Sequence, residues 1–435
     1  MNLKNLKEVY KSQGCKKIFI KKLAPNDNSK NQVYLGSSFE VLNIFPFTEI
    51  VADSSGNWER DRFKAFLNFY WLNDDGNIYN APRAQLILYP KYPEVRFSGF
   101  LSKCENPPSS LMTIREANRL LFLGVSSDGK IIGYVTSSNS SLAEEFNSQD
   151  FKDTIGIFTI LHLIKANNKS ELIKELTRIH LLGWIDSKRL DKNGKILPCK
   201  SSNCGGYTLE AELGVTPNGF SEPDYLGWEI KQFGVSNFKK IRSKVITLMT
   251  PEPNGGDYKE LGVNDFLHTY GYEDKLGRPD RINFGGIHKI GDKHPTTKLT
   301  LKLIGFDSES NKIRNSDGRI ALVTETDREA ASWSFASLLK HWNRKHNQAC
   351  YLPSLSQTSP TRKYYFGDRA ILGIGTDFTY FLKEMNSQNI YYDPGIKMEN
   401  VSTKPKVKKR SQFRIKSGNL KNLYQSNEEV FFDEE

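Results

Sequence analysis

The sequence predicts two domains, the first mostly β and the second α/β. The chain has 435 residues, and a domain commonly has about 100–200 residues. Short strand-like stretches separated by turn signals fill residues 16–137, a pattern typical of a β-sandwich or barrel. Helical and strand-like stretches alternate after residue 168. We therefore expect one domain over residues 1–150 and a second over residues 168–435.

In the first domain, turn signals such as Asn73–Gly76 and Ser127–Gly129 separate runs rich in β-branched and aromatic residues. The expected strands cover residues 16–23, 32–36, 63–72, 84–90, 95–101, 119–126 and 131–137. A helix is expected near Thr113–Leu121, and the polar, serine-rich residues 136–149 are typical of a domain edge.

In the second domain, apolar residues recur at helical spacing through residues 168–183, which predicts a helix. Further helices are expected at residues 209–213, 332–341 and 378–386, and strands at residues 227–232, 298–306 and 319–324. The acidic residues 428–435 are expected to form a mobile tail.

The composition excludes several classes of protein. Hydrophobic residues make up 38% of the chain and aromatic residues 12%, which is enough for buried cores and rules out a fully disordered chain. No run of about 18 apolar residues is present, so no transmembrane helix is expected. The charged beginning of the chain is not followed by the apolar region of a secretory signal. We therefore expect a cytoplasmic protein.

The charge balance favours a polyanionic partner. The chain has 61 Lys and Arg residues against 50 Asp and Glu residues, a formal net charge of +11. Its isoelectric point is about 9.1, which indicates nucleic acid as the partner class. Charge alone does not decide the matter, because many basic proteins bind no acidic partner.

The five cysteines do not form a disulfide or zinc pattern. Cys199 and Cys204 have a spacing that a zinc site can use, but no second pair of ligands follows closely. Without a secretion signal, reduced thiols are the expected state.

The most informative stretch contains Asp224, Glu229 and Lys231. Alternate residues of a strand point to the same face, so Glu229 and Lys231 project side by side with Ile230 buried behind them. Asp224 precedes a turn into that strand, and Glu210 lies upstream on an expected helix. Carboxylates bind Mg²⁺, and a lysine can orient water or offset charge during phosphodiester hydrolysis. The same Glu–Lys spacing is also common on ordinary solvated strands.

The block TLEAELGV…SEPDYLGWEIKQ resembles the metal-binding core of MvaI/BcnI-type restriction endonucleases, a branch of the PD-(D/E)xK nucleases related to MutH. The resemblance extends over about residues 168–425, including residues 183–189, 332–338 and 413–415. It implies a restriction-endonuclease-like α/β fold, a Mg²⁺ cofactor and action as a monomer. It implies the catalytic residues Glu210, Asp224, Glu229 and Lys231, of which Glu210, Asp224 and Glu229 are the metal ligands.

Residues 404–416 form a basic run, KPKVKKRSQFRIK. Such a run can be a solvated loop, or it can neutralise phosphates and make DNA binding depend on salt. In the resembling enzymes this region reaches base edges, so Lys408, Lys409, Arg410 and Arg414 are candidate DNA contacts. The family's histidine-containing stretch is replaced here by residues 407–412, while Arg414 matches and can contact guanine.

Residues 18–46 are similar to an EcoRII-type effector domain, a DNA-binding pseudobarrel, and residues 89–100 are similar to the second recognition arm of such domains. The similarity covers about residues 8–140 and implies arms that grip the major groove. By position, the first arm contains Lys21, Lys22 and Asn31, and the second contains Lys91, Glu94 and Arg96. The alternative is a strand edge with ordinary surface charges.

Together these resemblances predict a type II, IIE-like restriction endonuclease that cuts double-stranded DNA at a CC(A/T)GG-type site. The N-terminal domain is expected to bind a second copy of the site, and a cognate DNA methyltransferase is expected as a genetic partner only. A non-cleaving DNA-binding regulator and a MutH-like strand-nicking repair endonuclease remain alternatives. Gly373-Ile374-Gly375 lacks a third glycine and predicts no dinucleotide site.

Overall fold

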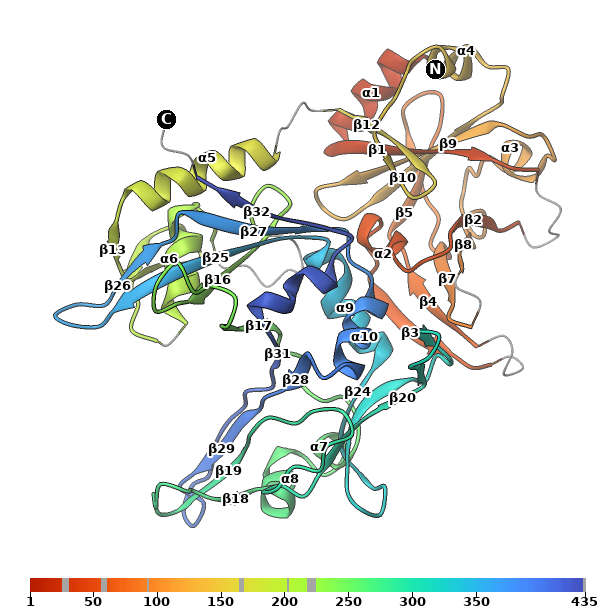
Figure 1. Ribbon diagram of the computed structural model, residues 1–435. Coiled ribbons are helices and arrows are strands. Elements are labelled where there is room, and N and C mark those ends of the chain that lie inside the picture. Colours follow the sequence, from red (N-terminus) through yellow and green to blue (C-terminus); the bar gives the residue numbers. More distant parts are fainter. Residues whose placement is uncertain are drawn as a thin grey trace. The chain divides into compact units, whose positions relative to one another are not determined.

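The chain divides into two compact units, unit 1 over Met1–Ala166 and unit 2 over Asn167–Glu435 (Figure 1). This computed structural model describes residues 1–25, 31–55, 61–91, 94–163, 168–201, 203–216 and 224–432. Within these residues, no helix is both long enough and apolar enough to cross a membrane.

Among its described residues, unit 1 contains two sheets whose strands are antiparallel except for one parallel pair, β5 and β10. The seven-stranded sheet consists, in spatial order, of β11 (Thr154–Ile155), β12 (Phe158–His162), β1 (Cys15–Leu23), β9 (Arg119–Ser126), β10 (Ile131–Thr136), β5 (Phe69–Leu72) and β6 (Ile78–Asn80). The five-stranded sheet consists of β2 (Val33–Gly36), β8 (Glu94–Ser98), β7 (Gln85–Tyr89), β4 (Arg62–Phe66) and β3 (Glu49–Asp53).

Aromatic side chains join the two sheets of unit 1. Phe69 of β5 lies 4.9 Å, between ring centroids, from Phe97 of β8, and Phe97 stacks on Phe100 at 4.6 Å. The short helices are α1 (Leu3–Ser12), α2 (Val41–Ile44), α3 (Ser109–Thr113) and α4 (Ser141–Asn147). Helix α1 buries Leu3, Leu6 and Tyr10 because three- and four-residue spacings return to one helix face.

Two expectations for unit 1 need correction. The helix predicted near Thr113–Leu121 is wrong: α3 ends at Thr113 and β9 begins at Arg119. Strand β9 lies between β1 and β10, so sheet pairing decides the conformation of this apolar run. The polar residues 136–149 contain α4, whose Leu142, Ala143 and Phe146 are buried in the core. The compact unit continues past this helix to β12.

The central sheet of unit 2 has six strands. Along its main path lie β13 (Trp184–Asp186), β26 (Lys363–Phe366), β25 (Gln348–Gln357), β27 (Arg369–Ile374) and β32 (Ser426–Phe431), and β16 (Glu229–Gly234) pairs in parallel with β25. One face of this sheet packs against α5 (Asn168–Leu181) and α6 (Cys204–Glu212). Figure 1 shows α5 lying along the sheet.

The rest of unit 2 consists of smaller sheets and helices. The sheets are β14 (Lys188–Leu190) with β15 (Ile196–Pro198); β17 (Val245–Met249), β31 (Phe413–Lys416) and β28 (Ile390–Tyr392); β18 (Tyr272–Glu273), β19 (Arg281–Gly285), β29 (Gly395–Glu399) and β30 (Lys406–Lys408); β20 (Thr300–Ile304), β23 (Arg319–Val323) and β24 (Glu329–Ser334); and β21 (Phe306–Asp307) with β22 (Lys312–Ile313). The helices are α7 (Asp257–Glu260), α8 (Val263–Tyr270), α9 (Phe335–His346), α10 (Phe378–Asn386) and the 3₁₀ helix η2 (Ser417–Leu423).

Two further expectations differ from the structure of unit 2. Residues 332–334 belong to β24, and α9 begins only after Ser334, whose side chain caps it by accepting from the Ser337 amide. The acidic tail is a strand over residues 426–431, because β32 pairs with β27 and its Glu428 and Glu429 meet basic side chains. Residues 433–435 of that expected tail lie outside the described residues.

The expectation of reduced thiols is wrong for one pair of cysteines. Cys199 and Cys204 form a disulfide with their Cα atoms 5.7 Å apart. Cys199 follows β15 and Cys204 begins α6, so the reversal of the chain between these elements brings the two sulfurs together. Cys15, Cys104 and Cys350 are free thiols.

Candidate functional site

Strand β16 carries an acidic and a basic side chain on one face. Glu229 is only 3% exposed, and its Oε1 lies 2.9 Å from the Nζ of Lys231. Ile230, between them, faces the opposite way into the apolar cluster formed with α5 and α6. The alternation predicted for this strand therefore exists, and the pair is largely shielded from water. A buried ion pair of this kind differs from Glu–Lys pairs on the solvent-exposed face of a strand, which contribute little to stability.

A tight turn places Asp224 beside β16. The amide of Tyr225 donates to the carbonyl of Trp228 and the amide of Trp228 donates back, at 3.0 and 2.8 Å. The two central residues, Leu226 and Gly227, have φ of 50° and 86°, as the mirror-image hairpin turns require. Asp224 Oδ2 then accepts a hydrogen bond of 2.9 Å from the amide of Ile230. Its carboxylate is thus anchored to the strand that carries Glu229 and Lys231.

A residue of helix α5 also holds this turn. The side-chain amide of Asn168, the first residue of α5, donates to the carbonyl of Leu226 at 2.8 Å. The sequence reasoning missed Asn168, because 58 residues separate it from the turn and no local pattern marks it. Pro223, the other residue of the Pro–Asp pair, lies outside the described residues.

Glu210 lies on α6, next to Leu209, which is fully buried against the sheet. The helix approaches β16 closely at Gly205, where an added Cβ would lie 2.5 Å from Oε1 of Gln232. Glu210 itself is half-buried. The fold therefore packs its helix against β16 on the face of Ile230 and Gln232, opposite the face that carries Glu229 and Lys231.

The carboxylates fit a cation that takes few protein ligands. In the described parts of the chain, no group of three His, Cys, Asp or Glu side chains is arranged to hold a metal ion. Mg²⁺ commonly binds through one or two carboxylates and completes its shell with water and substrate phosphate. Glu229 and Asp224, hard oxygen donors on neighbouring segments, suit that mode of binding.

The basic run of residues 404–416 is largely ordered into strands. It contains β30, at the edge of the sheet with β29, and β31, between β17 and β28. Lys408 pairs with Glu399 at 3.3 Å and Lys409 pairs with Glu252 at 3.0 Å. Arg410 is exposed, and its side chain lies against Gly395, where an added Cβ would be 3.0 Å from Nε of Arg410. These three cations lie together on one exposed segment.

Arg414, on β31, is half-buried and bound by its Nη1 to the carboxylate of Asp393. Asp393 follows β28, which pairs directly with β31. The sequence reasoning missed Asp393, because an acid 21 residues away has no visible link to the arginine. The ion pair restrains the direction of the guanidinium, which is what a base-reading arginine requires.

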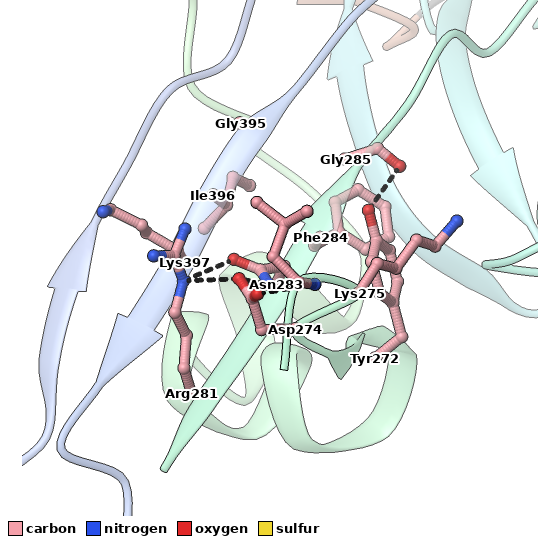
Figure 2. Close-up of a pocket in the computed structure, with 11 residues that line it drawn as sticks. Tyr272, Asp274, Lys275, Arg281, Asn283, Phe284, Gly285, Gly395, Ile396 and Lys397 are labelled. Atoms are coloured by element: carbon pink, nitrogen blue, oxygen red, sulfur yellow. Dashed lines mark hydrogen bonds and ion pairs between the residues drawn. The ribbon is translucent and has the colours of Figure 1, made fainter. Parts of the chain in front are cut away.

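A pocket opens on the sheet of β18, β19 and β29 (Figure 2). Its volume is about 260 Å³, and its lining includes Lys275, Arg281 and Lys397 with the carboxylate of Asp274. Asp274 receives a hydrogen bond from Asn283 and pairs with Arg281 at 3.2 Å. Arg281 and Lys397 also pair with Glu399, at 3.7 and 2.5 Å, so the three cations are accompanied by two carboxylates. Lys275 and Arg281 belong to the hairpin of β18 and β19, and the distant strand β29 contributes Lys397.

In unit 1, the structure brings residues of the two predicted arms together. Tyr34 of β2 is the register partner of Arg96 on β8, and the ammonium of Lys21 lies 5.9 Å from the centre of the Tyr34 ring. Arg96 pairs with Glu94 at 2.8 Å and donates to Gln32 at 3.2 Å. Burial lowers the pKa of Lys21. Lys21, Tyr34, Glu94 and Arg96 therefore form one patch, which we call the arm patch.

The other predicted arm residues are less closely connected. Lys22 is exposed on β1, while Asn31 and Lys91 are half-buried, and Asn31 has a positive φ of 48°. Asn31 and Lys91 border segments, residues 26–30 and 92–93, that lie outside the described residues.

Comparison with known proteins assigns the catalytic unit. The MvaI/BcnI restriction endonuclease family matches residues 173–424, more than half of the chain. A solved complex of restriction endonuclease MvaI with cognate DNA substrate is 18% identical over 62% of this chain and 100% of the other, with a TM-score of 0.46. A solved structure of MvaI without DNA is 17% identical over 62% of this chain and 99% of the other, with a TM-score of 0.33. No curated protein matches the chain. The chain belongs to the MvaI/BcnI restriction endonuclease family and is a site-specific restriction endonuclease.

Proposed function

We propose that this enzyme hydrolyses phosphodiesters of double-stranded DNA with Mg²⁺, using Glu210, Asp224, Glu229 and Lys231. The observation that carries the proposal is the buried Glu229–Lys231 pair on the strand that anchors Asp224. Bound Mg²⁺ supplies a Lewis acid at the phosphate and a more acidic water. Asp224 and Glu229 are its proposed ligands, with Glu210 binding directly or through water.

Lys231 has two proposed roles at the scissile phosphate. Its ammonium, held by Glu229 at 2.9 Å, offsets the negative charge that develops in the transition state. It also orients the attacking water by donating a hydrogen bond. The hydrogen bond from Ile230 to Asp224 keeps this carboxylate in reach of the same phosphate.

A plasmid digest tests the cleavage chemistry. We expect discrete fragments with Mg²⁺ and none with a chelator, and we expect mapped ends to fall at CC(A/T)GG-type sites, the sequence class implied by the resemblance. A monomer with one active site cuts the two strands in succession, so nicked circles should precede linear DNA. Fragments that form with chelator present, or nicked circles that never become linear, would contradict the proposal.

For DNA binding, we propose that Arg414 contacts a guanine and that Lys408, Lys409 and Arg410 contact phosphates. Replacing Arg410 by Ala should weaken binding equally on specific and unrelated duplexes. The slope of log K against log salt should become shallower by about 0.9, because one fewer counterion is released. Fluorescence anisotropy at several salt concentrations measures both quantities. Lys383→Ala, on α10, removes an exposed cation elsewhere in the unit and is the matched control; an equal change in its slope would refute the assignment.

For unit 1, we propose an effector role: its two arms, with Lys21, Lys22 and Asn31 in one and Lys91, Glu94 and Arg96 in the other, bind a second copy of the recognition site. The arm patch supports this, because it joins both arms. Its Arg96 is restrained by the carboxylate of Glu94, by the side-chain amide of Gln32 and by the ring of Tyr89, whose centre lies 5.6 Å away. Glutamate and arginine are suited to cytosine and guanine edges respectively. A cognate methyltransferase is the proposed genetic partner.

Arg96→Ala tests this role on a plasmid with a single site. For the wild type, we expect a short duplex containing the site to change the cleavage rate when added in trans. For Arg96→Ala that change in rate should be lost, since each good base contact contributes about 1–3 kcal/mol of discrimination. The cleavage rate without added duplex should stay the same as that of the wild type. Lys130→Ala, which removes an ion-paired surface lysine of the same unit, should respond like the wild type. An Arg96→Ala enzyme that still responds fully would contradict the effector role.

A further inference from the structure

The hairpin of β14 and β15 carries an excess of positive charge. Residues 188–200 contain five basic residues and a single acid, Asp191. Four of the five basic side chains are exposed, those of Arg189, Lys192, Lys195 and Lys200. Among the described residues, no carboxylate forms an ion pair with any of these four. We call them the hairpin patch.

The one acid of the hairpin is engaged by the backbone. The carboxylate of Asp191 accepts hydrogen bonds from the amides of Asn193 and Lys195, at 2.8 and 2.9 Å. The amide of Asp191 in turn donates to the carbonyl of Lys195 at 2.9 Å. These bonds close the turn, so the backbone of Lys192 and Lys195 is held in place while their side chains remain exposed.

One face of the hairpin is turned toward the protein and the other is open. Residues that pair across two strands share a face, and side chains alternate along each strand. Lys188 and Leu190 occupy the first face: Leu190 is buried, and Nζ of Lys188 lies 2.5 Å from Oε1 of Glu212 on α6. Arg189 and Lys195 occupy the second face, since the register partner of Arg189 lies two residues after Lys195. The exposed cations of the strands therefore point away from α6.

The hairpin is also fixed to helix α6, which carries Glu210. The amide of Lys188 donates to Oγ1 of Thr208 at 3.1 Å. The disulfide of Cys199 and Cys204 joins the end of the hairpin to the first residue of the helix. A ligand bound to the hairpin patch thus has a fixed position relative to this helix.

We infer that the hairpin patch binds DNA phosphates and is a second backbone-binding surface of the catalytic unit, separate from residues 404–416. Duplex DNA presents one charge per about 1.7 Å of its axis, and each cation that meets a phosphate releases a counterion. Lys408 and Lys409 of the basic run are each paired with a carboxylate, whereas the hairpin patch has no such partner among the described residues. The inference extends the proposed cleavage of double-stranded DNA and rests on it for the identity of the anion.

The salt dependence of DNA binding tests the hairpin patch. Lys192→Ala/Lys195→Ala removes two of its cations, and alanine at position 195 keeps the backbone amide that binds Asp191. Anisotropy of a fluorescent duplex containing the site, with the full-length protein and Ca²⁺ in place of Mg²⁺, gives the slope of log K against log salt. We expect this slope to become shallower by about 1.8, since each lost phosphate contact contributes about 0.9. The same change is expected on an unrelated duplex, because phosphates carry no sequence information.

The matched control is Lys312→Ala/Lys383→Ala. Both lysines are exposed in the same unit, and Lys312 also lies on a two-stranded hairpin, in β22. This variant should keep the wild-type slope. An equal change in both double variants, or no change in Lys192→Ala/Lys195→Ala, would overturn the inference.

A second measurement needs no substitution and decides the matter should the double variant fail to fold. Acetic anhydride acetylates exposed lysine amines, and mass spectrometry of the wild-type enzyme with and without the duplex gives the extent at each lysine. Bound DNA should protect Lys192, Lys195 and Lys200 several-fold, while Lys312 and Lys383 keep their reactivity. A plasmid digest with Mg²⁺ is run in parallel. Cleavage without protection of the three lysines would overturn the hairpin role alone, whereas protection without cleavage would overturn the proposed cleavage alone.

Discussion

Replacing Lys231 by Ala should reduce DNA cleavage by about 10³-fold, the scale observed when one group that stabilises transition-state charge is removed. The ammonium lies beside Glu229 on one face of β16. The methyl group of alanine can neither offset negative charge nor orient a water molecule. The measurement is the single-turnover rate on a one-site duplex at saturating Mg²⁺. Specific DNA binding, measured with Ca²⁺ in place of Mg²⁺, should be retained, since the lysine acts on the chemical step.

The matched control for this variant is Lys64→Ala. Lys64 is also a half-buried strand lysine in an ion pair, 2.7 Å from Asp53, but it belongs to unit 1. Its loss should leave the single-turnover rate near that of the wild type. Persistent cleavage by purified Lys231→Ala enzyme would show that the catalytic lysine lies elsewhere.

Replacing Asp224 by Asn should reduce cleavage by at least about 10²-fold. Asparagine keeps an oxygen that can accept from the Ile230 amide, so the turn should survive while the charge is lost. A divalent ion contributes several kcal/mol of transition-state stabilisation, and about 1.4 kcal/mol corresponds to a factor of ten. Because a weakened metal site is the cause, we expect part of the loss to be recovered at high Mg²⁺ concentration.

Asp191→Asn is the corresponding control. Asp191 also accepts backbone hydrogen bonds, from Asn193 and Lys195 at 2.8 and 2.9 Å, but in the exposed turn between β14 and β15. Thermal unfolding of both variants should confirm that the fold is intact. If Asp224→Asn cleaves at the wild-type rate and with the wild-type Mg²⁺ dependence, Asp224 is not a ligand.

Local patterns predicted those parts of the molecule that depend on neighbours in the chain. The helical spacing of Leu172, Leu176 and Ile179 predicted α5, and these residues are buried in the core of unit 2. The expected helix at residues 378–386 matches α10. The alternation around Ile230 predicted the face shared by Glu229 and Lys231. In each case the period of the backbone alone relates the residues.

The errors fall where pairing across the fold decides the conformation. Leu120 and Leu121 suit a helix as well as a strand, and β1 and β10 on either side make them a strand. The acidic residues Glu428 and Glu429 suggested a mobile tail. They lie in a strand instead, where Lys169 pairs with Glu428 and Arg369 pairs with Glu429. Neither partner could be identified by reading along the chain.

By itself, the sequence determined the catalytic strand, the residue types of a phosphodiesterase site and the family to which the chain belongs. Only the tertiary structure decided how Asp224 reaches that strand, through a turn with Leu226 at a positive φ. It also decided which distant side chains hold the candidate residues: Asn168 contacts the turn, and Asp393 pairs with Arg414. The reason is physical, since periodicity relates residues within one element, whereas contacts between elements depend on how their buried faces pack.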